Sequence, residues 1–424
     1  MQSPLPQPNG DPHRILLINQ YAGSPSLGME FRPSAFAREW ERMGHRTLIV
    51  AGAPSHLRAR NPELRRKVTS ERVDGVDFEW YRLPPYDGNG VRRAANIVTF
   101  AARLRARRRA LARELEPDIV IASSTHPLDI YGARWIAKRC GARLVFEVHD
   151  LWPQTPIELG GVSPRNPFIM AMSRAERYAC RHADLVVSIL HSTDEYLVTR
   201  GLDRARFVHI PNGISAETLT GRAEALPAAH TELIASLRAT GTFIVGYTGG
   251  IGMANALDDL VSAVALVRDR QIAVLLWGDG PERAALEEQI RSEGIANVHL
   301  LGRIPRTAVG SALAACDAAF LGWKRLGIYR YGVSPNKLWD YMAAARPILH
   351  ATSAPGDPVA ACGCGVSVPA EDPRALADAL VDLASRPAEE LAEMGRRGRA
   401  SVEQNNDYAV LAARFLAAVE QSRR

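Results

Sequence analysis

Short, continuous apolar runs recur along the chain, and a polar turn and an amphipathic stretch follow most of them. The first run covers residues 14–21. A loop rich in glycine, serine and proline follows at 22–29, and residues 33–43 have the period of a helix that ends at Gly44. A second run at 45–51 completes a strand–helix–strand unit. Continuous apolar runs are typical of parallel strands buried on both faces, so the pattern predicts a doubly wound α/β fold.

The same alternation continues along the chain and restarts once. Further apolar runs predict strands at residues 117–123, 143–149, 183–188, 207–210, 242–247, 272–277, 297–301 and 317–322. The stretch 216–241 is rich in alanine and polar residues, which is typical of a connection between domains. We therefore predict a first Rossmann-like domain at 14–215, a linker at 216–241, a second Rossmann-like domain at 242–402 and a final helix at 403–424.

The longest amphipathic stretch is Val91–Leu115, which carries eight arginines and one acidic residue. A narrow apolar stripe runs along its helical projection and consists of Ile97, Phe100, Leu104, Leu111 and Leu115. Such a helix suits an anionic membrane surface. A solvated surface helix docked by its stripe would show the same pattern, whereas a nucleic-acid site would interleave aromatic residues with the arginines. We expect no nucleic-acid partner.

Composition shows an uneven distribution of charge and indicates the cellular compartment. The chain of 424 residues has a net charge of +6, which divides into +9 over residues 1–215 and −3 over residues 216–424. No apolar run approaches the ~18 residues that a membrane span requires, and the polar start has no signal-peptide core. The five cysteines are scattered, which is typical of reduced thiols. We expect a cytoplasmic protein.

In the first domain, polar side chains follow two of the predicted strands. His126 follows the strand at 117–123, and His149 and Asp150 follow the strand at 143–149. The carboxyl ends of parallel strands form the ligand-binding edge of such a sheet, so these side chains are candidates for an active site. Each histidine taken alone would equally suit a packing or surface role.

In the second domain, three strands run into glycine turns. The turns begin at Thr248, Gly278 and Gly302, and each follows a predicted strand directly. Glycine turns let backbone N–H groups approach phosphate oxygens, because no side chain holds the backbone away. A polar loop and an amphipathic helix at 331–349 form a further predicted anion-binding site. There Ser334 or Asn336 is expected to cap the helix and Lys337 to add charge. An ordinary capped helix would show the same local pattern.

Several of these segments resemble the glycosyltransferases of family 4. The loop and helix read Ser334-Pro-Asn-Lys-Leu-Trp-Asp-Tyr-Met-Ala-Ala-Ala-Arg-Pro-Ile348, which is similar to the family pattern S-P-x-K-L-x-E-Y-M-A-x-G-x-P-I. Phe146-Glu-Val-His-Asp-Leu-Trp-Pro153 and Gly278-Asp-Gly-Pro-Glu282 also resemble family segments. Within the family, the chain resembles transferases of the fucosamine-transferase type that build O-antigen, capsule or lipopolysaccharide. This resemblance implies the GT-B fold, in which two Rossmann-like doubly wound domains face each other across a cleft, and a last helix that returns to the first domain.

The resemblance implies transfer of a sugar from a nucleoside diphosphate with retention of configuration. The implied acceptor is a glycan on a polyprenyl diphosphate, no cofactor or metal is implied, and the basic helix would touch the inner membrane face. The implied catalytic residues are His126, Asp150, Lys337 and Asp340, with Asp340 bonded to the ribose. The implied donor-binding residues are Gly28, Gly249, Gly250, Gly252, Gly278, Asp279, Gly280, Gly302, Arg303, Ile304, Ser334, Pro335 and Asn336. Arg32 is a further candidate for an anion contact.

Four departures from the family pattern matter. Asp340 stands where the family usually has the second of two glutamates. Gly250 and Asn255 stand where the family has an arginine and a lysine, and Gly332 stands where it has the first of two glutamates. Lys337 is therefore expected to supply the missing positive charge, and the contact to the sugar is left open. A GT-B epimerase of sugar nucleotides, or an inactive homologue acting as a scaffold, are the alternatives.

Overall fold

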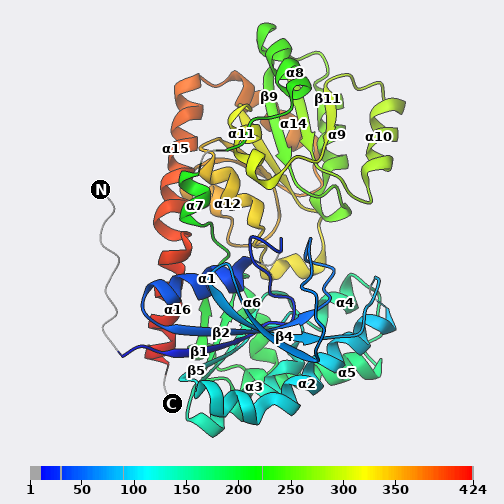
Figure 1. Ribbon diagram of the computed structural model, residues 1–424. Helices are drawn as coiled ribbons and strands as arrows, with labels where there is room; N and C mark the ends of the chain where they lie inside the picture. Colours follow the sequence, from blue (N-terminus) through cyan, green and yellow to red (C-terminus); the bar gives the residue numbers. More distant parts are fainter. Residues whose placement is uncertain (1–10, 29–30, 89, 222, 423–424) are drawn as a thin grey trace. The chain divides into compact units, whose positions relative to one another are not determined.

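The computed structural model describes residues 11–28, 31–88, 90–221 and 223–422, which form two compact units (Figure 1). The first unit holds the chain up to Asn212 together with the segment that begins at Tyr408, and the second holds Gly213–Asp407. The segment at 216–241 contains two helices and falls within the second unit.

The first unit is built on an eight-stranded sheet with the order β3-β4-β2-β1-β5-β6-β7-β8. Every neighbouring pair is parallel except the hairpin of β3 and β4. The strands are β1 (Arg14–Ile18), β2 (Arg46–Ala53), β3 (Val68–Val73), β4 (Val76–Arg82), β5 (Ile119–Ala122), β6 (Arg143–Val148), β7 (Leu185–Ser188) and β8 (Phe207–His209).

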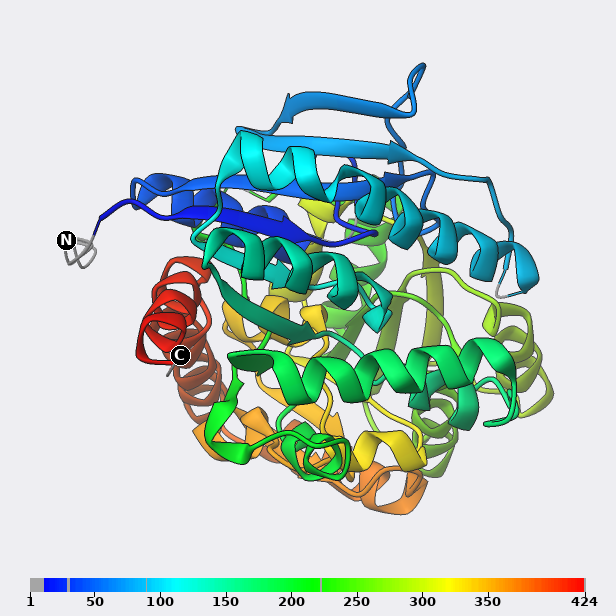
Figure 2. The same cartoon turned by 90° about the horizontal axis from the view of Figure 1, so that it is seen from below.

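Helices connect the parallel strands of this sheet, and Figure 2 shows α2 and α3 running side by side. The α-helices are α1 (Phe31–Arg42), α2 (Val91–Leu115), α3 (Ile130–Cys140), α4 (Gln154–Glu158), α5 (Pro167–His182), α6 (Thr193–Thr199) and α16 (Tyr408–Gln421). Short 3-10 turns are η1 (Pro127–Asp129) and η2 (Arg204–Arg206).

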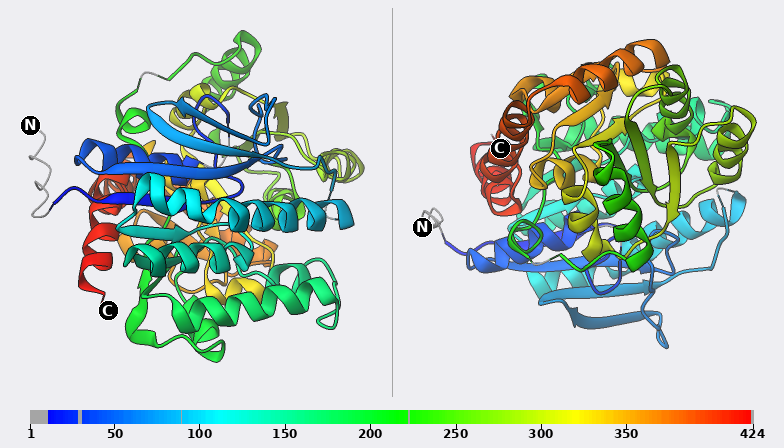
Figure 3. Two further views of the ribbon diagram at one scale, coloured as in Figure 1. Left: turned by 60° about the horizontal axis from the view of Figure 1, so that its bottom comes forward. Right: turned by 90° about the horizontal axis from the view of Figure 1, so that it is seen from above.

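The last helix of the chain, α16, packs against α1 near the start of the chain (Figure 3). Phe36 and Trp40 of α1 contact the ring of Phe415 at centroid distances of 5.6 and 5.3 Å. The Trp40 indole N–H also donates to the Ala412 carbonyl at 3.2 Å. Burial of three large aromatic side chains stabilises this contact, because each removes a large apolar area from water.

The second unit has a six-stranded, fully parallel sheet with the order β11-β10-β9-β12-β13-β14. Its strands are β9 (Phe243–Thr248), β10 (Ile272–Trp277), β11 (Val298–Gly302), β12 (Ala318–Gly322), β13 (Ile348–Ala351) and β14 (Gly365–Val368). Its α-helices are α7 (Ala216–Thr220), α8 (Ala228–Ala239), α9 (Leu257–Leu266), α10 (Arg283–Ser292), α11 (Val309–Ala314), α12 (Asn336–Ala343), α13 (Pro358–Cys362), α14 (Pro373–Ser385) and α15 (Ala388–Asn405). Its 3-10 turns are η3 (Met253–Asn255), η4 (Arg306–Ala308) and η5 (Gly327–Tyr331).

Each sheet changes the direction of its winding once. Strand β1 lies between β2 and β5, and β9 lies between β10 and β12, so neighbouring connections leave these strands on opposite sides. Ligands of doubly wound sheets bind where the winding reverses, at the carboxyl ends of the strands. A ligand is therefore expected next to the residues that follow β1 and β9.

The apolar runs predicted most strands to within two or three residues, and β10 has the predicted bounds. Both strands of the hairpin, β3 and β4, were missed. The side chains of β3 are half-buried or exposed, which leaves no apolar run to detect, and acidic residues interrupt the apolar run of β4. Strand β14 was missed for the same reason as β3.

The basic stretch Val91–Leu115 is a single helix, as its period predicted. Its apolar stripe is buried inside the first unit, where Phe100 and Leu104 are fully covered. The stripe completes the core of its own domain, as expected of a surface helix docked by its stripe. Contact of this helix with a membrane stays a prediction. Of the helices in the described ranges, none has the length and apolar composition of a membrane span.

Candidate functional site

Two of the three predicted glycine turns touch each other at the carboxyl edge of the second sheet. A Cβ added to Gly278 would lie 1.8 Å from the Gly249 carbonyl oxygen, and one added to Gly280 would lie 2.2 Å from the Ile251 oxygen. Only glycine fits at such distances, which explains the residue type at both positions. The Gly249 N–H donates to the Trp277 carbonyl at 2.9 Å, so the turn after β9 is fastened to the end of β10.

Gly249 itself has a φ of +150°, a backbone conformation that favours glycine. Gly250 is exposed and a Cβ there would meet nothing within 4 Å. Gly252 precedes the 3-10 turn η3 in an extended conformation. The predicted turn after β9 thus presents backbone at the surface of the sheet edge, as a phosphate seat requires.

The ammonium group of Lys337 lies directly over this turn. Its Nζ donates to the Tyr247 hydroxyl oxygen at 2.9 Å and to Asn255 Oδ1 at 2.6 Å, and it lies 4.6 Å from the centre of the Tyr247 ring. A Cβ at Gly249 would lie 3.1 Å from the same nitrogen. The structure therefore brings Lys337 and Gly249 together, as the sequence predicted.

Both of these acceptors of Lys337 are neutral, so neither offers a negative charge that would stabilise the ammonium form. Burial of the half-buried side chain lowers the pKa of Lys337 to about 7. A lysine with that pKa gains a proton readily when an anion arrives, because the anion favours the charged form. The arrangement suits a group that responds to a bound diphosphate.

The start of helix α12 differs from the prediction in its cap. Pro335 occupies the N-cap position and supplies no side-chain hydrogen bond to the helix. The N-cap residue is therefore neither Ser334 nor Asn336. Pro335 has an extended backbone, so the chain enters the helix through proline geometry.

Asp340 lies one turn further along α12 and forms an ion pair that the sequence did not indicate. Both of its carboxylate oxygens accept from Arg306, at 2.5 and 2.6 Å. The Asp340 side chain is 7% exposed and that of Arg306 is 55% exposed. Burial raises the pKa of Asp340, although Arg306 acts in the opposite direction. The predicted ribose ligand is thus covered by a guanidinium in this structure.

The turn after β11 contributes the remaining predicted donor residues. Gly302 has a φ of +76°, and its carbonyl accepts from the Gly278 N–H at 2.8 Å, which links the second turn to the third. Arg303 is exposed and pairs with Asp279 at 3.2 Å. Ile304 is half-buried against the core cluster that contains Trp277. The three turns therefore form one continuous rim.

In the first unit, His126 is fully buried. Its Nδ1 accepts from the Leu128 N–H at 3.3 Å, so its Nε2 must carry the proton and donate to Gln20 Oε1. The chain of donors continues from Gln20 to Asn96 and from Asn96 to the Pro84 carbonyl. Burial lowers the pKa of His126 to about 3, so the imidazole is neutral. This is the environment of a packed histidine, and its catalytic role stays a prediction.

Asp150 is half-buried at the end of β6 and organises the turn that follows. One oxygen accepts from the Leu151 N–H at 2.8 Å and from Thr155 Oγ1 at 2.6 Å, and the other accepts from the Trp152 indole at 3.2 Å. The segment that carries the family resemblance therefore holds its own shape through this carboxylate. Its proposed contact with substrate stays a prediction.

Arg32 is not available as an anion contact. Its guanidinium is 4% exposed and donates to Glu147 at 3.0 Å and to the carbonyls of Pro211 and Ile210. Ser123 and His149 also contact Glu147. Burial alone would raise the pKa of Glu147, but Arg32 and His149 hold it well below its usual range.

Gly28 also approaches the protein itself. It has a φ of +68°, and a Cβ there would lie 2.8 Å from the Ala59 side chain. The turn is therefore shaped by packing between two loops of the first unit. Contact of Gly28 with a donor stays a prediction.

Sequence reasoning missed Tyr247, Asn255 and Arg306 as members of this site. Tyr247 belongs to an apolar strand pattern, and Asn255 stood out only as a departure from the family pattern. Arg306 lies 34 positions before its partner Asp340, so no local spacing could indicate the pair. Within the described ranges, no group of three or more His, Cys, Asp or Glu side chains could hold a metal ion.

Comparison with protein families gives two matches. Residues 28–213 match the glycosyl transferase 4-like domain, and residues 242–386 match the glycosyl transferases group 1. Together these matches span most of the two units. The first covers β2–β8 of the first sheet together with His126 and Asp150, and the second covers all three glycine turns and helix α12.

Individual relatives are distant. WbjE of Pseudomonas aeruginosa, named as a glycosyltransferase, is 23% identical over 353 residues, which are 81% of this chain and 84% of WbjE. WcaI of Escherichia coli K12, named for colanic acid biosynthesis, is 23% identical over 72% of this chain and 75% of WcaI. The crystal structure of Anabaena HepE with UDP is 16% identical, with a TM-score of 0.66 over 96% of this chain and 99% of HepE. This likeness shows the GT-B fold.

Proposed function

This chain belongs to the glycosyltransferases that join a glycosyl transferase 4-like domain to a group 1 domain, and on that premise we propose its donor, acceptor and mode of transfer. The donor is a nucleoside-diphosphate sugar bound by the second domain. The acceptor is a polyprenyl-diphosphate-linked glycan bound by the first domain. The sugar is transferred with retention of configuration and without a metal ion.

The position of the Lys337 ammonium over the Gly249 turn carries this proposal. A cation 3.1 Å from the place of a Cβ on Gly249 stands where backbone N–H groups and a bound diphosphate would meet. When the glycosidic bond to the diphosphate breaks, negative charge grows on the leaving phosphate. Lys337 and the turn amides would stabilise that charge, as a divalent cation does in metal-dependent transferases.

Asp340 and Arg306 fit the nucleoside side of the donor. A ribose has two vicinal hydroxyls, and a carboxylate accepts from both while remaining charged. Ribose bound at Asp340 would replace the bidentate contact of Arg306, whose guanidinium is half exposed. The HepE complex with UDP makes a uridine nucleotide the first candidate for the donor.

Cell-surface polysaccharide biosynthesis is the proposed setting, in the cytoplasm at the inner face of the membrane. Its support comes from WcaI, which is named for colanic acid biosynthesis. A lipid-linked acceptor lies in a membrane, so the enzyme must reach that surface. We assign this contact to the charged face of α2 rather than to its apolar stripe, because the stripe is buried.

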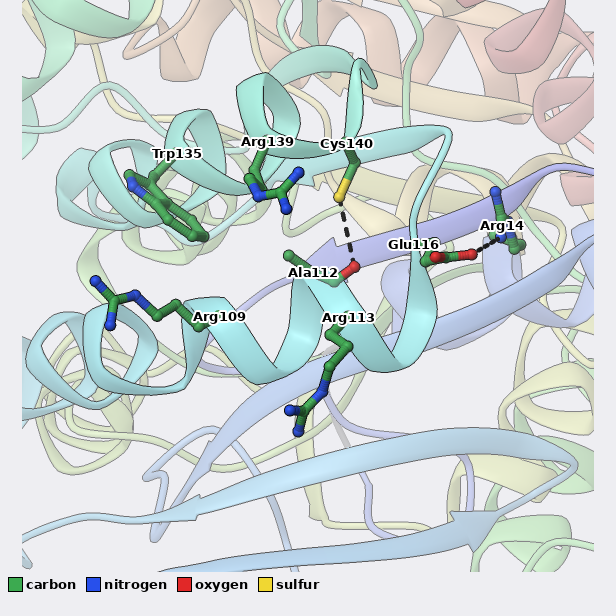
Figure 4. A pocket seen from close by; sticks show the side chains of 8 residues that line it. All are labelled: Arg14, Arg109, Ala112, Arg113, Glu116, Trp135, Arg139 and Cys140. Carbon is green, nitrogen blue, oxygen red and sulfur yellow. Dashed lines mark hydrogen bonds and ion pairs between the residues drawn. The ribbon is translucent and has the colours of Figure 1, made fainter.

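A pocket of about 710 Å³ between α2 and α3 strengthens the choice of this face (Figure 4). Arg109 and Arg113 come from α2 and Arg139 comes from α3, and Trp135 lies beside them. The acidic lining residue, Glu116, is held by Arg14 at 2.9 Å, so its charge is compensated. The remaining positive charge suits the phosphate groups of anionic lipids.

A panel of sugar nucleotides tests the proposed function. The protein is incubated with each donor, with and without lipid-linked acceptor, and released diphosphate is measured for the native chain and for Lys337→Ala. We expect acceptor-dependent release that Lys337→Ala lowers at least tenfold. Conversion of a donor to its epimer without acceptor would instead identify an epimerase. No binding of any nucleoside diphosphate would favour a scaffold.

A further inference from the structure

We propose that Asn255, together with Tyr247, is a positioning residue that aims Lys337 at the donor diphosphate. The inference rests on the proposed function, because it concerns the same phosphate seat. Asn255 stands where the family resemblance places a lysine. In this structure the asparagine instead holds the cation that α12 supplies.

The three side chains and one carbonyl form a closed ring of hydrogen bonds. Lys337 donates to the Tyr247 hydroxyl oxygen and to Asn255 Oδ1. The Tyr247 hydroxyl donates to the Gly250 carbonyl at 2.6 Å, and Asn255 Nδ2 donates to the same carbonyl at 3.0 Å. Both ends of the asparagine amide are therefore used, and the ring ties the lysine to the glycine turn.

This ring fixes the orientation of the asparagine amide. The Gly250 carbonyl can only accept, so the NH₂ end of Asn255 must face it and the oxygen must face Lys337. A reversed amide would place two donors against each other at Lys337. The Asn255 oxygen is thus presented to the ammonium by the backbone of the turn itself.

The ring leaves one N–H donor of the Lys337 ammonium for a ligand. A charged ammonium has three N–H donors, and Tyr247 and Asn255 accept two of them. One donor is left for a ligand at the Gly249 turn. Since Gly249 has no side chain, the ammonium lies against the backbone there, 3.1 Å from the place a Cβ would occupy. The ring therefore holds the flexible Lys337 side chain in one orientation, with its remaining N–H directed at the ligand. This lowers the conformational entropy that the lysine loses when the ligand binds.

A double-mutant cycle tests the coupling, with UDP as the probe and isothermal titration calorimetry as the measurement. Lys337→Ala should weaken UDP binding by about 30-fold and Asn255→Ala by about 10-fold, the range for hydrogen bonds to charged groups. In the Lys337→Ala background, Asn255→Ala should change UDP affinity by less than about twofold, because its effect passes through the lysine. Met253→Ala, which removes an exposed side chain of the same turn η3, is the matched control.

A pH series adds a measurement that a merely structural role would not change. The groups that face Lys337 are Tyr247 on β9 and Asn255 on η3, and Asp340 on the same helix is engaged by Arg306. Asn255→Asp places a carboxylate beside the ammonium, so UDP binding should persist to higher pH than in the native chain. Asn255→Ala should lose UDP binding at lower pH. Thermal unfolding of each ligand-free variant shows that the fold is kept.

The outcomes separate this inference from the proposed function. If Lys337→Ala binds UDP as the native chain does, or if the native chain binds neither UDP nor GDP, the diphosphate seat is misplaced and both proposals fail. If Lys337→Ala weakens binding but Asn255→Ala has no effect, or has the same effect in both backgrounds, the positioning role fails and the diphosphate seat stands.

Discussion

Arg306 and Asp340 form a bidentate ion pair in the second domain, with the guanidinium half in solvent and the carboxylate buried. A buried carboxylate that loses its partner is costly, and the loss depends on its charge. Removal of Arg306 should therefore lower the free energy of unfolding by an amount that depends on pH.

Arg306→Ala should lower the free energy of unfolding by about 2 kcal/mol near pH 7.5. This lies between the ~1 kcal/mol of an exposed pair and the ~3–5 kcal/mol of a fully buried one, because solvent screens the arginine. The variant raises the pKa of Asp340 further, so its deficit should grow as pH rises and fade toward about pH 3, below the ordinary pKa of an aspartate, where the carboxyl is protonated with and without Arg306. Urea unfolding at both pH values measures this, and a deficit independent of pH would contradict it.

Gly278→Ala should disrupt the glycine rim. The new Cβ would lie 1.8 Å from the Gly249 oxygen, so the two turns must separate, at a cost of about 3 kcal/mol and with loss of UDP binding. Gly250→Ala is the matched control, because nothing lies within 4 Å of its Cβ. Thermal unfolding and calorimetry compare the two, and equal stability of both variants would show that the turns do not need close contact.

UDP affinity should depend on the protonation of Lys337. In the free protein its pKa is about 7, and a bound diphosphate raises it, so binding takes up a proton above pH 7. Affinity should therefore fall as pH rises from 7 to 9, approaching tenfold per pH unit. Titration in buffers of different ionisation enthalpy measures the proton uptake. Lys337→Met should remove most of this dependence, and an unchanged slope would assign the proton to another group.

Glu147→Gln should destabilise the first domain by about 3 kcal/mol at pH 7, because the buried Arg32 loses its counter-charge. The folded-state pKa of Glu147 is depressed, so its contribution is present above the unfolded value near 4.3 and is lost as pH falls below it. The difference between native chain and variant should therefore shrink below pH 4. Glu288→Gln, which alters an exposed pair, should change stability by less than about 0.5 kcal/mol.

Charge reversal on α2 should abolish binding to anionic vesicles. Arg105→Glu, Arg109→Glu and Arg113→Glu together should lower affinity for phosphatidylglycerol vesicles at least about 100-fold, since each arginine contributes ~1 kcal/mol at such a surface. Reversal of exposed arginines of the second domain, at 268, 270 and 374, is the control with the same change of net charge. Equal effects of the two triple variants, or binding that does not weaken with salt, would contradict docking by this face.

The sequence by itself determined the two doubly wound domains, the places of the glycine turns and the full extent of helix α2. Apolar periodicity and glycine positions are local properties, and strands buried on both faces leave a pattern that can be read without knowing their neighbours. Lys337 was found in the same way, from a motif within one loop and helix.

Tertiary structure alone decided what lies against each of these elements. Periodicity showed that α2 has an apolar face, but only the fold showed that its own domain covers that face. Arg306 lies 34 positions from its partner Asp340, and Asn255 lies 82 positions from Lys337. Arg32 binds Glu147, which is 115 positions away. Partners so far apart are brought together by the packing of whole strands and helices, which leaves no trace in the spacing of either residue.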